Sequence, residues 1–581
     1  MTSEPLTTTA AISAARLRRD RASASPLIRI TSLGRLAAIG LILGAVILLG
    51  RLLEQVQPGD LSAIVSDGYL HRVIRFTLLQ ATLSTLLAVL LAVPVARALA
   101  RQSHFPLRGL LLRLFSLPLV MPSLVAIFGV VDIYGQQGLL ARLTDQLMQV
   151  TGWQIAWPSI YGLSGILIAH VFFNLPLAVR LLLPAWAAVP AETWRLAAQL
   201  GMSGAQVFRI IELPLLRRAV PQIAATIFML CVTSFAIILT LGGGPRASTL
   251  EVAIFQAIRF DADLPRAGLL ALIELALCLT VGLVCRGLTR RMDLGAGLGR
   301  PLWRHDGATL VGRCGDGAWI IVAGLFVVLP EAALLVDGLA GFSHPLPWPA
   351  LLQAGLLGLG LALVAGLVAT LLGYLLAATI PLAADPRAGI VARLLRRVGQ
   401  SGQSLAGLLP LALSPMVLGM GLYLLITDAA NSDLFAGVDS DGWATNIWPV
   451  LGIIGLNAAM GVPYTLTMLQ PALDQSRTKH DRLCRELGIA GFRRFRLIDW
   501  PVLRPQIGTA LALATSLGLG DLVGISLFGN PDLRTLGILL YEQIGAYRLS
   551  DAATTALILL TTVLIVFGGL ERLVGSRRRH Y

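Results

Sequence analysis

The sequence RLAAQLGMSGAQVFRIIELP at residues 195–214 is repeated as RLCRELGIAGFRRFRLIDWP at residues 482–501. The two stretches align without a gap at an offset of 287 positions, and Pro176 matches Pro463 at the same offset. Further matches follow downstream, where the segment that begins at Gly243 resembles the one that begins at Gly529. A nearly constant offset over such a length predicts that the chain is an internal duplication.

The composition predicts an integral membrane protein. Of the 581 residues, 56% are hydrophobic and 13% are charged, and the mean hydropathy is +0.76. An average globular chain has about 25% charged residues, so this chain cannot cover a water-exposed surface with polar groups. That excludes a cytosolic enzyme and a secreted disulfide-rich domain. The arginines behind the net charge of +14 lie at the ends of apolar runs, which indicates a membrane-lipid partner rather than a nucleic acid.

A helix that spans a membrane needs about 20 mostly apolar residues, and the chain contains twelve candidate stretches. They lie at about 36–50, 76–99, 114–134, 162–183, 219–241, 267–285, 318–336, 356–379, 405–425, 447–468, 507–528 and 552–570. The predicted fold class is an all-α polytopic membrane protein with about twelve transmembrane helices in two tandem six-helix halves. An even number of spans returns the chain to its starting side, so a pseudo-twofold axis along the membrane normal relates the halves.

Basic residues gather on one side of the predicted bilayer. The end of the second span and the turn after it hold four arginines, Arg97, Arg101, Arg108 and Arg113, and no acid, whereas the loop after the ninth span holds four aspartates and no base. The positive-inside bias then places both termini in the cytoplasm. The resulting divisions are a disordered cytoplasmic tail at 1–35, a first transmembrane domain at 36–286, a cytoplasmic linker at 287–317, a second transmembrane domain at 318–573 and a basic cytoplasmic tail at 574–581.

The repeated stretch falls in the cytoplasmic loop after the fourth span of each half, at about 190–218 and 474–504. In the first loop, Gly201 favours a tight, left-handed turn after a short helix. Ser203 and Gln206 have the spacing of a capping box, which predicts a second short helix.

We expect Pro214 to end that second helix before the fifth span. We also expect Trp194, Phe208 and Leu213 to be exposed beside arginines. An elbow of this kind suits docking into a groove of another protein.

The spacing of Gly201, Ile211, Leu213 and Pro214 resembles the loop motif of permease subunits in bacterial binding-protein-dependent ATP-binding-cassette importers. The second loop matches it with Trp500 in place of leucine, and the usual leading glutamate falls on Arg195 and Arg482. The resemblance implies that both loops are coupling helices, which transmit the movement of ATPase subunits. The residues assigned to this role are Arg195, Ala197, Gly201, Phe208, Ile211, Leu213, Pro214, Arg482, Gly488, Phe495, Ile498, Trp500 and Pro501.

Three longer segments, at 161–183, 241–258 and 527–548, resemble the fused permeases of thiamine and thiamine pyrophosphate importers. This resemblance implies a multi-pass protein of the bacterial inner membrane that forms the pathway for thiamine or its phosphate esters. It also implies a periplasmic binding protein and two copies of a cytoplasmic ATPase, which would hold the ATP and Mg. A ferric-iron importer permease of the same fused design and a gradient-driven secondary transporter remain as alternatives.

The chain itself is not predicted to be an enzyme or to bind a cofactor or a metal. A Walker A loop needs a lysine followed by Ser or Thr, and Lys479, the single lysine, is followed by His480. The five cysteines are scattered and form no metal-binding pair.

Ionisable residues inside predicted spans are the candidates for the substrate pathway, because their burial in lipid is costly. They are His170 in the fourth span, Glu274 in the sixth and Asp521 in the eleventh. The alternative is that each one hydrogen-bonds a neighbouring helix and serves packing alone.

Overall fold

The computed structural model describes residues 33–56, 66–152, 157–244, 247–288, 304–307, 309–379, 407, 410, 413–430, 444–489 and 491–575. The described residues contain helices, turns and loops, and no strand. Most of both predicted tails and part of the linker lie outside them. The predicted all-α class is therefore confirmed.

The first half begins with the N-terminal helix Leu33–Glu54. The helices that follow are α3 (Gly68–Arg101), α4 (Arg108–Leu114), α5 (Ser123–Tyr134), α6 (Leu139–Thr151), α7 (Leu163–Ala187), α8 (Ala191–Gln199), α9 (Gly204–Val207), the π-helical turn η1 (Phe208–Glu212), α10 (Leu213–Val232), α11 (Ala236–Leu241), α12 (Leu250–Arg259) and α13 (Leu264–Leu288).

The second half follows the short 3-10 turn η3 (His305–Gly307). Its elements are α14 (Leu310–Ala340), η4 (Gly341–Ser343), α15 (Trp348–Thr379), α17 (Pro415–Ala430), α18 (Ala444–Glu486), α19 (Gly491–Arg494), the π-helical turn η6 (Phe495–Asp499), α20 (Trp500–Leu519), α21 (Val523–Phe528), α22 (Leu536–Gly545) and α23 (Leu549–Gly575).

Ten described helices are long and apolar enough to cross a membrane. They account for ten of the twelve predicted spans. The predicted ninth span corresponds to the shorter helix α17, and the predicted eleventh is divided between α20 and α21. The predicted fifth span is divided in the same way, between α10 and α11.

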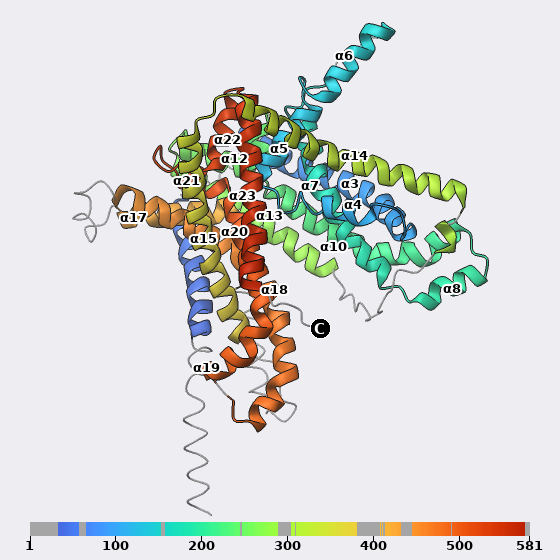
Figure 1. Ribbon diagram of the computed structural model, residues 1–581. Coiled ribbons are helices and arrows are strands. Elements are labelled where there is room, and N and C mark those ends of the chain that lie inside the picture. The colour runs from blue at the N-terminus through green and yellow to red at the C-terminus, as the bar shows by residue number, and fades with distance from the viewer. Residues whose placement is uncertain are drawn as a thin grey trace, which may run out of the picture.

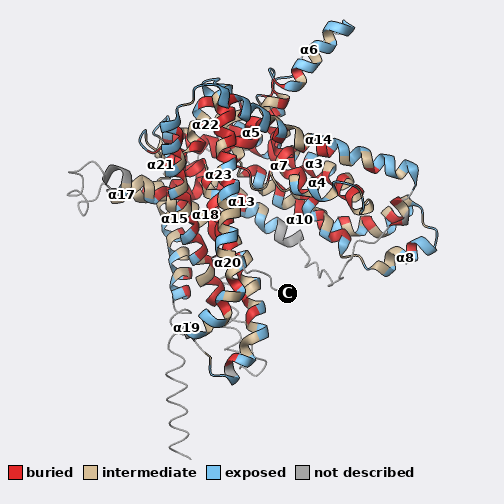
Figure 2. Ribbon diagram, in the orientation of Figure 1, coloured by how far each residue is buried: buried red, intermediate tan, exposed pale blue. Residues whose placement is uncertain are grey.

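Three packed helices form the centre of each half: α3, α7 and α10 in the first, and α15, α18 and α20 in the second. Small residues allow close approach, as expected for helices that meet inside a membrane. A Cβ atom at Gly366 would lie 2.4 Å from Thr515 Oγ1, and one at Gly373 would lie 2.2 Å from Thr465 Oγ1. Figure 2 shows the buried residues concentrated where these helices meet.

Each half contributes its first helix to the other half. The N-terminal helix packs on α15 and α17, where Gly34 meets Leu375 and Thr379 and where Leu48 meets Gly421. In turn, α14 packs against α3 and α5 of the first half. The two halves are therefore interlocked, although their central bundles are separate.

The broken helices show the duplication in three dimensions. Helix α10 ends at Val232 and α11 begins at Ala236, whereas α20 ends at Leu519 and α21 begins at Val523. Each pair of positions differs by 287, the offset of the sequence repeat. The π-helical turns η1 and η6 obey the same offset.

The expectation that Pro214 ends a short helix was wrong. Pro214 lies in the first turn of α10, and the chain enters that helix through η1 without a break. The Leu213 N–H donates to the carbonyl of Phe208, five residues back. A wider turn of this kind accommodates a ring that lacks an N–H and would clash with the carbonyl four residues before it.

The two repeated loops also differ in one respect. In the first half, Pro190 separates α7 from α8, whereas α18 continues through the corresponding region to Glu486. The residue equivalent to Pro190 is Arg477, which does not interrupt a helix. Figure 1 shows two limbs that diverge, with α8 near the end of one and α19 near the end of the other.

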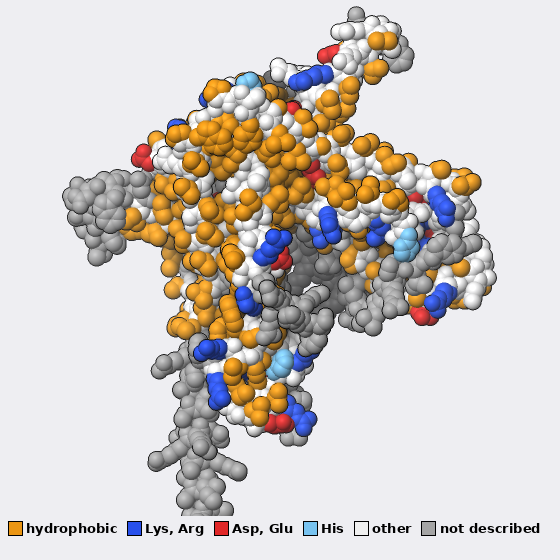
Figure 3. Space-filling model, viewed as in Figure 1, with side chains coloured by type: hydrophobic (Ala, Val, Ile, Leu, Met, Phe, Trp, Pro, Cys, Tyr) orange, Lys and Arg blue, Asp and Glu red, His pale blue; other side chains and the backbone are white. Residues whose placement is uncertain are grey.

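Hydrophobic side chains cover much of both limbs in the space-filling view (Figure 3). Among them, Leu86 and Leu90 of α3 and Leu367 of α15 are more than half exposed. Such faces are expected where lipid, rather than water, surrounds a helix.

Candidate functional site

Both repeated loops present a similar set of exposed side chains. We name residues 190–214 elbow 1 and residues 477–501 elbow 2. At five equivalent positions the exposed side chains of the two elbows are chemically alike, and we call these residues the coupling surface: Arg195, Leu196, Leu200, Arg209 and Ile210 in elbow 1 and Arg482, Leu483, Leu487, Arg496 and Leu497 in elbow 2. The exposed pairs Glu192 and Lys479, Gln199 and Glu486, and Gln206 and Arg493 differ in charge. Each pair differs by 287 in number. Three apolar side chains and two arginines on a small convex elbow suit a groove in a partner protein.

Tight turns hold the two helical arms of each elbow. Gly201 and Gly488 have φ values of +61° and +62°, a conformation that favours glycine. In elbow 1, the Gln206 N–H donates to Ser203 Oγ and the Ser203 N–H donates to Gln206 Oε1, so the predicted capping box is present.

The expectation that Trp194, Phe208 and Leu213 would be exposed was wrong, because all three are half-buried. The guanidinium of Arg304 lies 3.9 Å from the Trp194 ring centroid, and that of Arg97 lies 4.9 Å from the Phe208 ring centroid. These apolar side chains therefore face the protein, and Leu196, Leu200 and Ile210 face outward.

Most of the other motif residues also point inward. Ala197 and Cys484 are buried at equivalent positions, whereas Ile211, Phe495, Ile498 and Pro501 are half-buried. Phe495 packs between Tyr374 of α15 and Trp500, which is 38% exposed. Pro214 is exposed. The motif therefore mainly shapes each elbow, and only Arg195 and Arg482 of the predicted set belong to the coupling surface.

A buried carboxylate lies under each elbow, which the sequence reasoning missed. Glu212 is fully buried and accepts hydrogen bonds from Arg97 Nε at 2.6 Å, Arg304 at 2.6 Å and Trp186 Nε1 at 3.0 Å. Its equivalent, Asp499, forms an ion pair with Arg494 at 3.3 Å. The signal was available, since an acid precedes the Leu-Pro or Trp-Pro pair in both copies.

A cavity of about 380 Å³ lies between the two halves and brings two of the three pathway candidates together. Both His170 and Asp521 line it, together with Phe173, Phe235 and Ser516. The breaks between α10 and α11 and between α20 and α21 form part of its wall. Irregular backbone at membrane depth is tolerated where it lines a cavity of this kind.

The polar groups at the cavity are held by local hydrogen bonds. Asp521 accepts from the backbone N–H groups of Val523 at 3.0 Å and Gly524 at 2.8 Å, at the start of α21. His170 Nδ1 lies 2.9 Å from Ser84 Oγ, and its Nε2 has no partner among the described residues.

Glu274 lies elsewhere and does not line this cavity. Its fully buried carboxyl group lies beside Glu251, also fully buried, and Ser414. The sequence reasoning did not single out Glu251, because it lies in a short helix, α12, outside the predicted spans.

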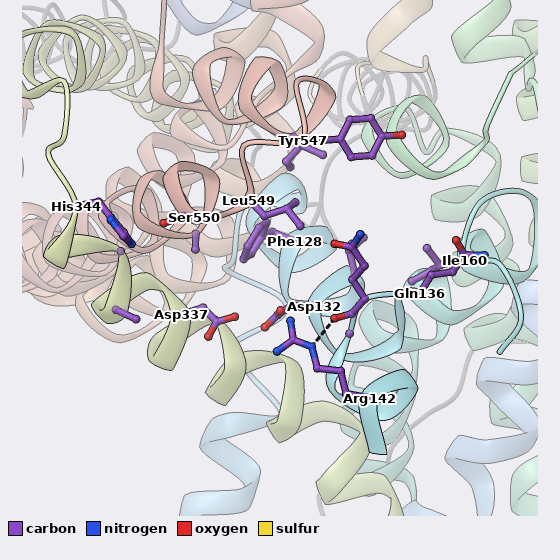
Figure 4. Close-up of a pocket in the computed structure, with 18 of the residues that line it drawn as sticks. Phe128, Asp132, Gln136, Arg142, Ile160, Asp337, His344, Tyr547, Leu549 and Ser550 are labelled. Carbon is purple, nitrogen blue, oxygen red and sulfur yellow. Dashed lines mark hydrogen bonds between the residues drawn. The ribbon is translucent and has the colours of Figure 1, made fainter. Parts of the chain in front are cut away.

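A second cavity, of about 410 Å³, lies at the end of the molecule away from the elbows and is lined by residues of both halves. Figure 4 shows the carboxyl groups of Asp132 and Asp337 pointing toward one another, with Arg142 nearby. The Arg142 Nε donates to the carbonyl of Gln137 at 2.9 Å. Tyr547 lies on the opposite side of the cavity in this view.

Comparison with known proteins agrees with this architecture. Residues 88–294 match the family described as binding-protein-dependent transport system inner membrane component. The matched region contains elbow 1, whereas elbow 2 lies outside it.

Three similar relatives are thiamine transport system permease proteins ThiP. That of Brucella abortus is 41% identical over 92% of this chain and 93% of the relative. That of Escherichia coli is 41% identical over 89% of this chain and 91% of the relative. That of Haemophilus influenzae is 37% identical over 86% of this chain and 88% of the relative. With ten apolar helices and relatives of this kind, the protein is a multi-pass inner-membrane protein. The chain belongs to the thiamine transport system permease family, a group of fused binding-protein-dependent inner-membrane transport components.

Proposed function

We propose that this chain is the permease subunit of an ATP-driven importer and forms the pathway for thiamine delivered by a periplasmic binding protein. The observation that carries the proposal is the central cavity, in which side chains of both halves surround Asp521. The similarity to thiamine permeases along nearly the whole chain supports the substrate.

The charge of the central cavity favours free thiamine over its phosphate esters. Asp521 is the one acidic lining residue, and no Lys or Arg is found among the described residues that line the cavity. Thiamine carries a positive thiazolium ring, which a carboxylate attracts, and the lining of the cavity also contains the aromatic residues Phe173 and Phe235. Thiamine pyrophosphate is anionic and finds no cationic side chain there.

The same lining disfavours ferric iron. Metal sites need several oxygen or nitrogen ligands that converge on one point. Among the described residues that line the cavity, the one carboxylate accepts two backbone N–H groups, the one histidine lies beside Ser84, and the other polar side chains are a neutral amide and hydroxyl groups. A ferric-iron permease is therefore the weaker reading of this cavity.

The two coupling surfaces support the proposal that two equivalent ATPase subunits drive transport. Because both surfaces consist of two arginines and three apolar side chains at a constant offset, each would bind the same groove on one copy of a cytoplasmic ATPase. ATP and Mg would be held by those subunits. Both elbows, and with them both termini, then lie on the cytoplasmic side.

Uptake of labelled thiamine tests the substrate assignment. Cells that lack their own thiamine uptake would express this chain with its binding protein and ATPase. We expect uptake that unlabelled thiamine abolishes, that thiamine pyrophosphate reduces weakly and that ferric iron leaves unchanged. Competition by ferric iron alone would overturn the assignment.

The energy source needs its own test. Uptake should disappear when the ATPase carries a substitution in its phosphate-binding loop, and purified complex in proteoliposomes should transport without an ion gradient. Uptake that persists without ATPase activity and stops with an uncoupler would identify a secondary transporter instead.

A further inference from the structure

The two elbows stabilise their buried carboxylates with arginines from different places. In elbow 2, Arg494 bridges Asp499 at 3.3 Å and Asp481 at 2.6 Å, so the whole arrangement lies within the elbow and the helix that leads into it. The equivalents of Asp481, Arg494 and Asp499 in the first half are Trp194, Val207 and Glu212. Elbow 1 therefore has the buried acid, but it has no arginine at the position equivalent to Arg494.

Arg97 of α3 already pairs with Glu212 at 2.6 Å, and the segment that joins the halves supplies a second guanidinium from outside the elbow. Arg304, which is 5% exposed, reaches Glu212 at 2.6 Å and stacks on the ring of Trp194 at 3.9 Å. It thus bridges positions 194 and 212, as Arg494 bridges positions 481 and 499. Val207, at the position equivalent to Arg494, lines the same small crevice as Trp194 and Arg304.

The acidic groups around Arg304 stabilise its charged guanidinium although it is buried. Burial by itself would lower the pKa of the Arg304 guanidinium, but hydrogen bonds with Asp306 and the charge of Glu212 outweigh it, so the pKa is raised. The pKa of Arg494 is raised in the same way, because Asp481 and Asp499 outweigh the effect of its burial.

The network continues from Arg304 into two long helices. Asp306 accepts from Arg304 at 2.8 Å and forms an ion pair with Arg101 of α3 at 3.2 Å. Arg101 also pairs with Asp316 of α14 at 3.2 Å, to which Gln102 donates at 2.9 Å. Elbow 1 is thereby tied to α3 and to the first helix of the second half, whereas elbow 2 has its arginine within itself.

We propose that the linker contributes to the function of elbow 1, and that Arg304 is a positioning residue that holds elbow 1 in place for energy coupling. In this proposal a force on elbow 1 reaches α3 directly through Glu212 and Arg97, and it reaches α14 through Arg304, Asp306 and Arg101, which pairs with Asp316. This rests on the proposed function, in which the elbows receive the movement of ATPase subunits.

The test has one readout without the ATPase and one with it. In the purified permease, Arg304→Ala should raise amide hydrogen exchange in elbow 1 about tenfold, because it leaves Glu212 buried with one cation fewer, and should leave elbow 2 unchanged. The matched control is Arg313→Ala, which removes an exposed arginine of α14 that forms no ion pair with the residues that the structure describes. Equal exchange in Arg304→Ala and Arg313→Ala would overturn the proposal.

In the assembled complex, single cysteines at Leu196 and Leu483, in a background without native cysteines, would be crosslinked to the ATPase. We expect Arg304→Ala to weaken the crosslink from position 196 alone and to lower the transport achieved per ATP hydrolysed. If neither position crosslinks in the parent complex, the proposed function fails. If both crosslink equally in Arg304→Ala, the inference about the linker fails.

A rescue variant separates positioning from general damage. Adding Trp194→Asp and Val207→Arg to Arg304→Ala copies the arrangement of elbow 2 into elbow 1. We expect this triple variant to restore slow exchange in elbow 1 and at least half of the coupling. A triple variant that folds, crosslinks at position 483 and remains as uncoupled as Arg304→Ala would contradict the proposed role.

Discussion

At the residue scale, the side chains that shape each elbow differ from those that it exposes. Gly201, Ile211 and Pro214 of the repeated motif determine how elbow 1 turns, through a positive φ, a half-buried side chain and a π-helical turn. The exposed apolar side chains are those of neighbours such as Leu196 and Leu200. A motif read from sequence therefore identified the elbow but not most of its exposed side chains.

The proposed preference for a positively charged substrate depends on Asp521. We expect Asp521→Asn to lower thiamine uptake roughly tenfold, since it removes about 1–2 kcal/mol of attraction for the cation. The preference for thiamine over thiamine pyrophosphate should fall with it. Competition uptake assays measure both, with Glu571→Gln at the exposed end of α23 as the control. Unchanged uptake and selectivity in Asp521→Asn would show that the carboxylate serves only to cap α21.

At the element scale, the left-handed turns decide the shape of both elbows. Each turn has open space around the glycine, so a methyl group there meets no neighbour and acts only through the backbone. We expect Gly201→Ala and Gly488→Ala each to cost about 1 kcal/mol locally and to lower transport several-fold. The control is Gly317→Ala in α14, a helical glycine with equally open surroundings. Transport rates and ATPase copurification provide the measurement, and wild-type values in both elbow variants would contradict the expectation.

The similarity of the two coupling surfaces predicts that equivalent substitutions in elbow 1 and elbow 2 have similar effects on ATPase binding. A charge in an apolar contact is costly, so Leu200→Asp and Leu487→Asp should each release the ATPase during purification, to a similar extent. Leu573→Asp, at an exposed position near the end of α23, serves as the control. Strong loss from one elbow and none from the other would show that the ATPase subunits do not bind the two surfaces equivalently.

At the scale of the whole molecule, the exchanged first helices join halves whose central bundles are separate. A Cβ at Gly34 would lie 2.2 Å from the carbonyl of Leu375, and one at Gly129 would lie 2.5 Å from that of Pro330. We expect Gly34→Leu and Gly129→Leu to lower the thermal unfolding temperature, since overpacking costs about 1–3 kcal/mol. Gly40→Leu, on an open face of the N-terminal helix, should not. Thermal unfolding in detergent, monitored by size-exclusion chromatography, distinguishes these outcomes.

The sequence by itself determined the membrane class, the two-half design and the position of both elbows, because apolar run length, charge bias and a fixed repeat offset are properties of the chain order. It also indicated His170 and Asp521 as candidates for the substrate pathway, because ionisable residues in apolar runs are conspicuous.

Only the tertiary structure decided that His170 and Asp521 share a cavity while Glu274 does not, that each half gives its first helix to the other, and that Arg304 completes elbow 1. The physical reason is that local signals act over a few residues. The partner of a buried charge is chosen by three-dimensional packing, which brought Arg304 to Glu212 across 92 positions of sequence.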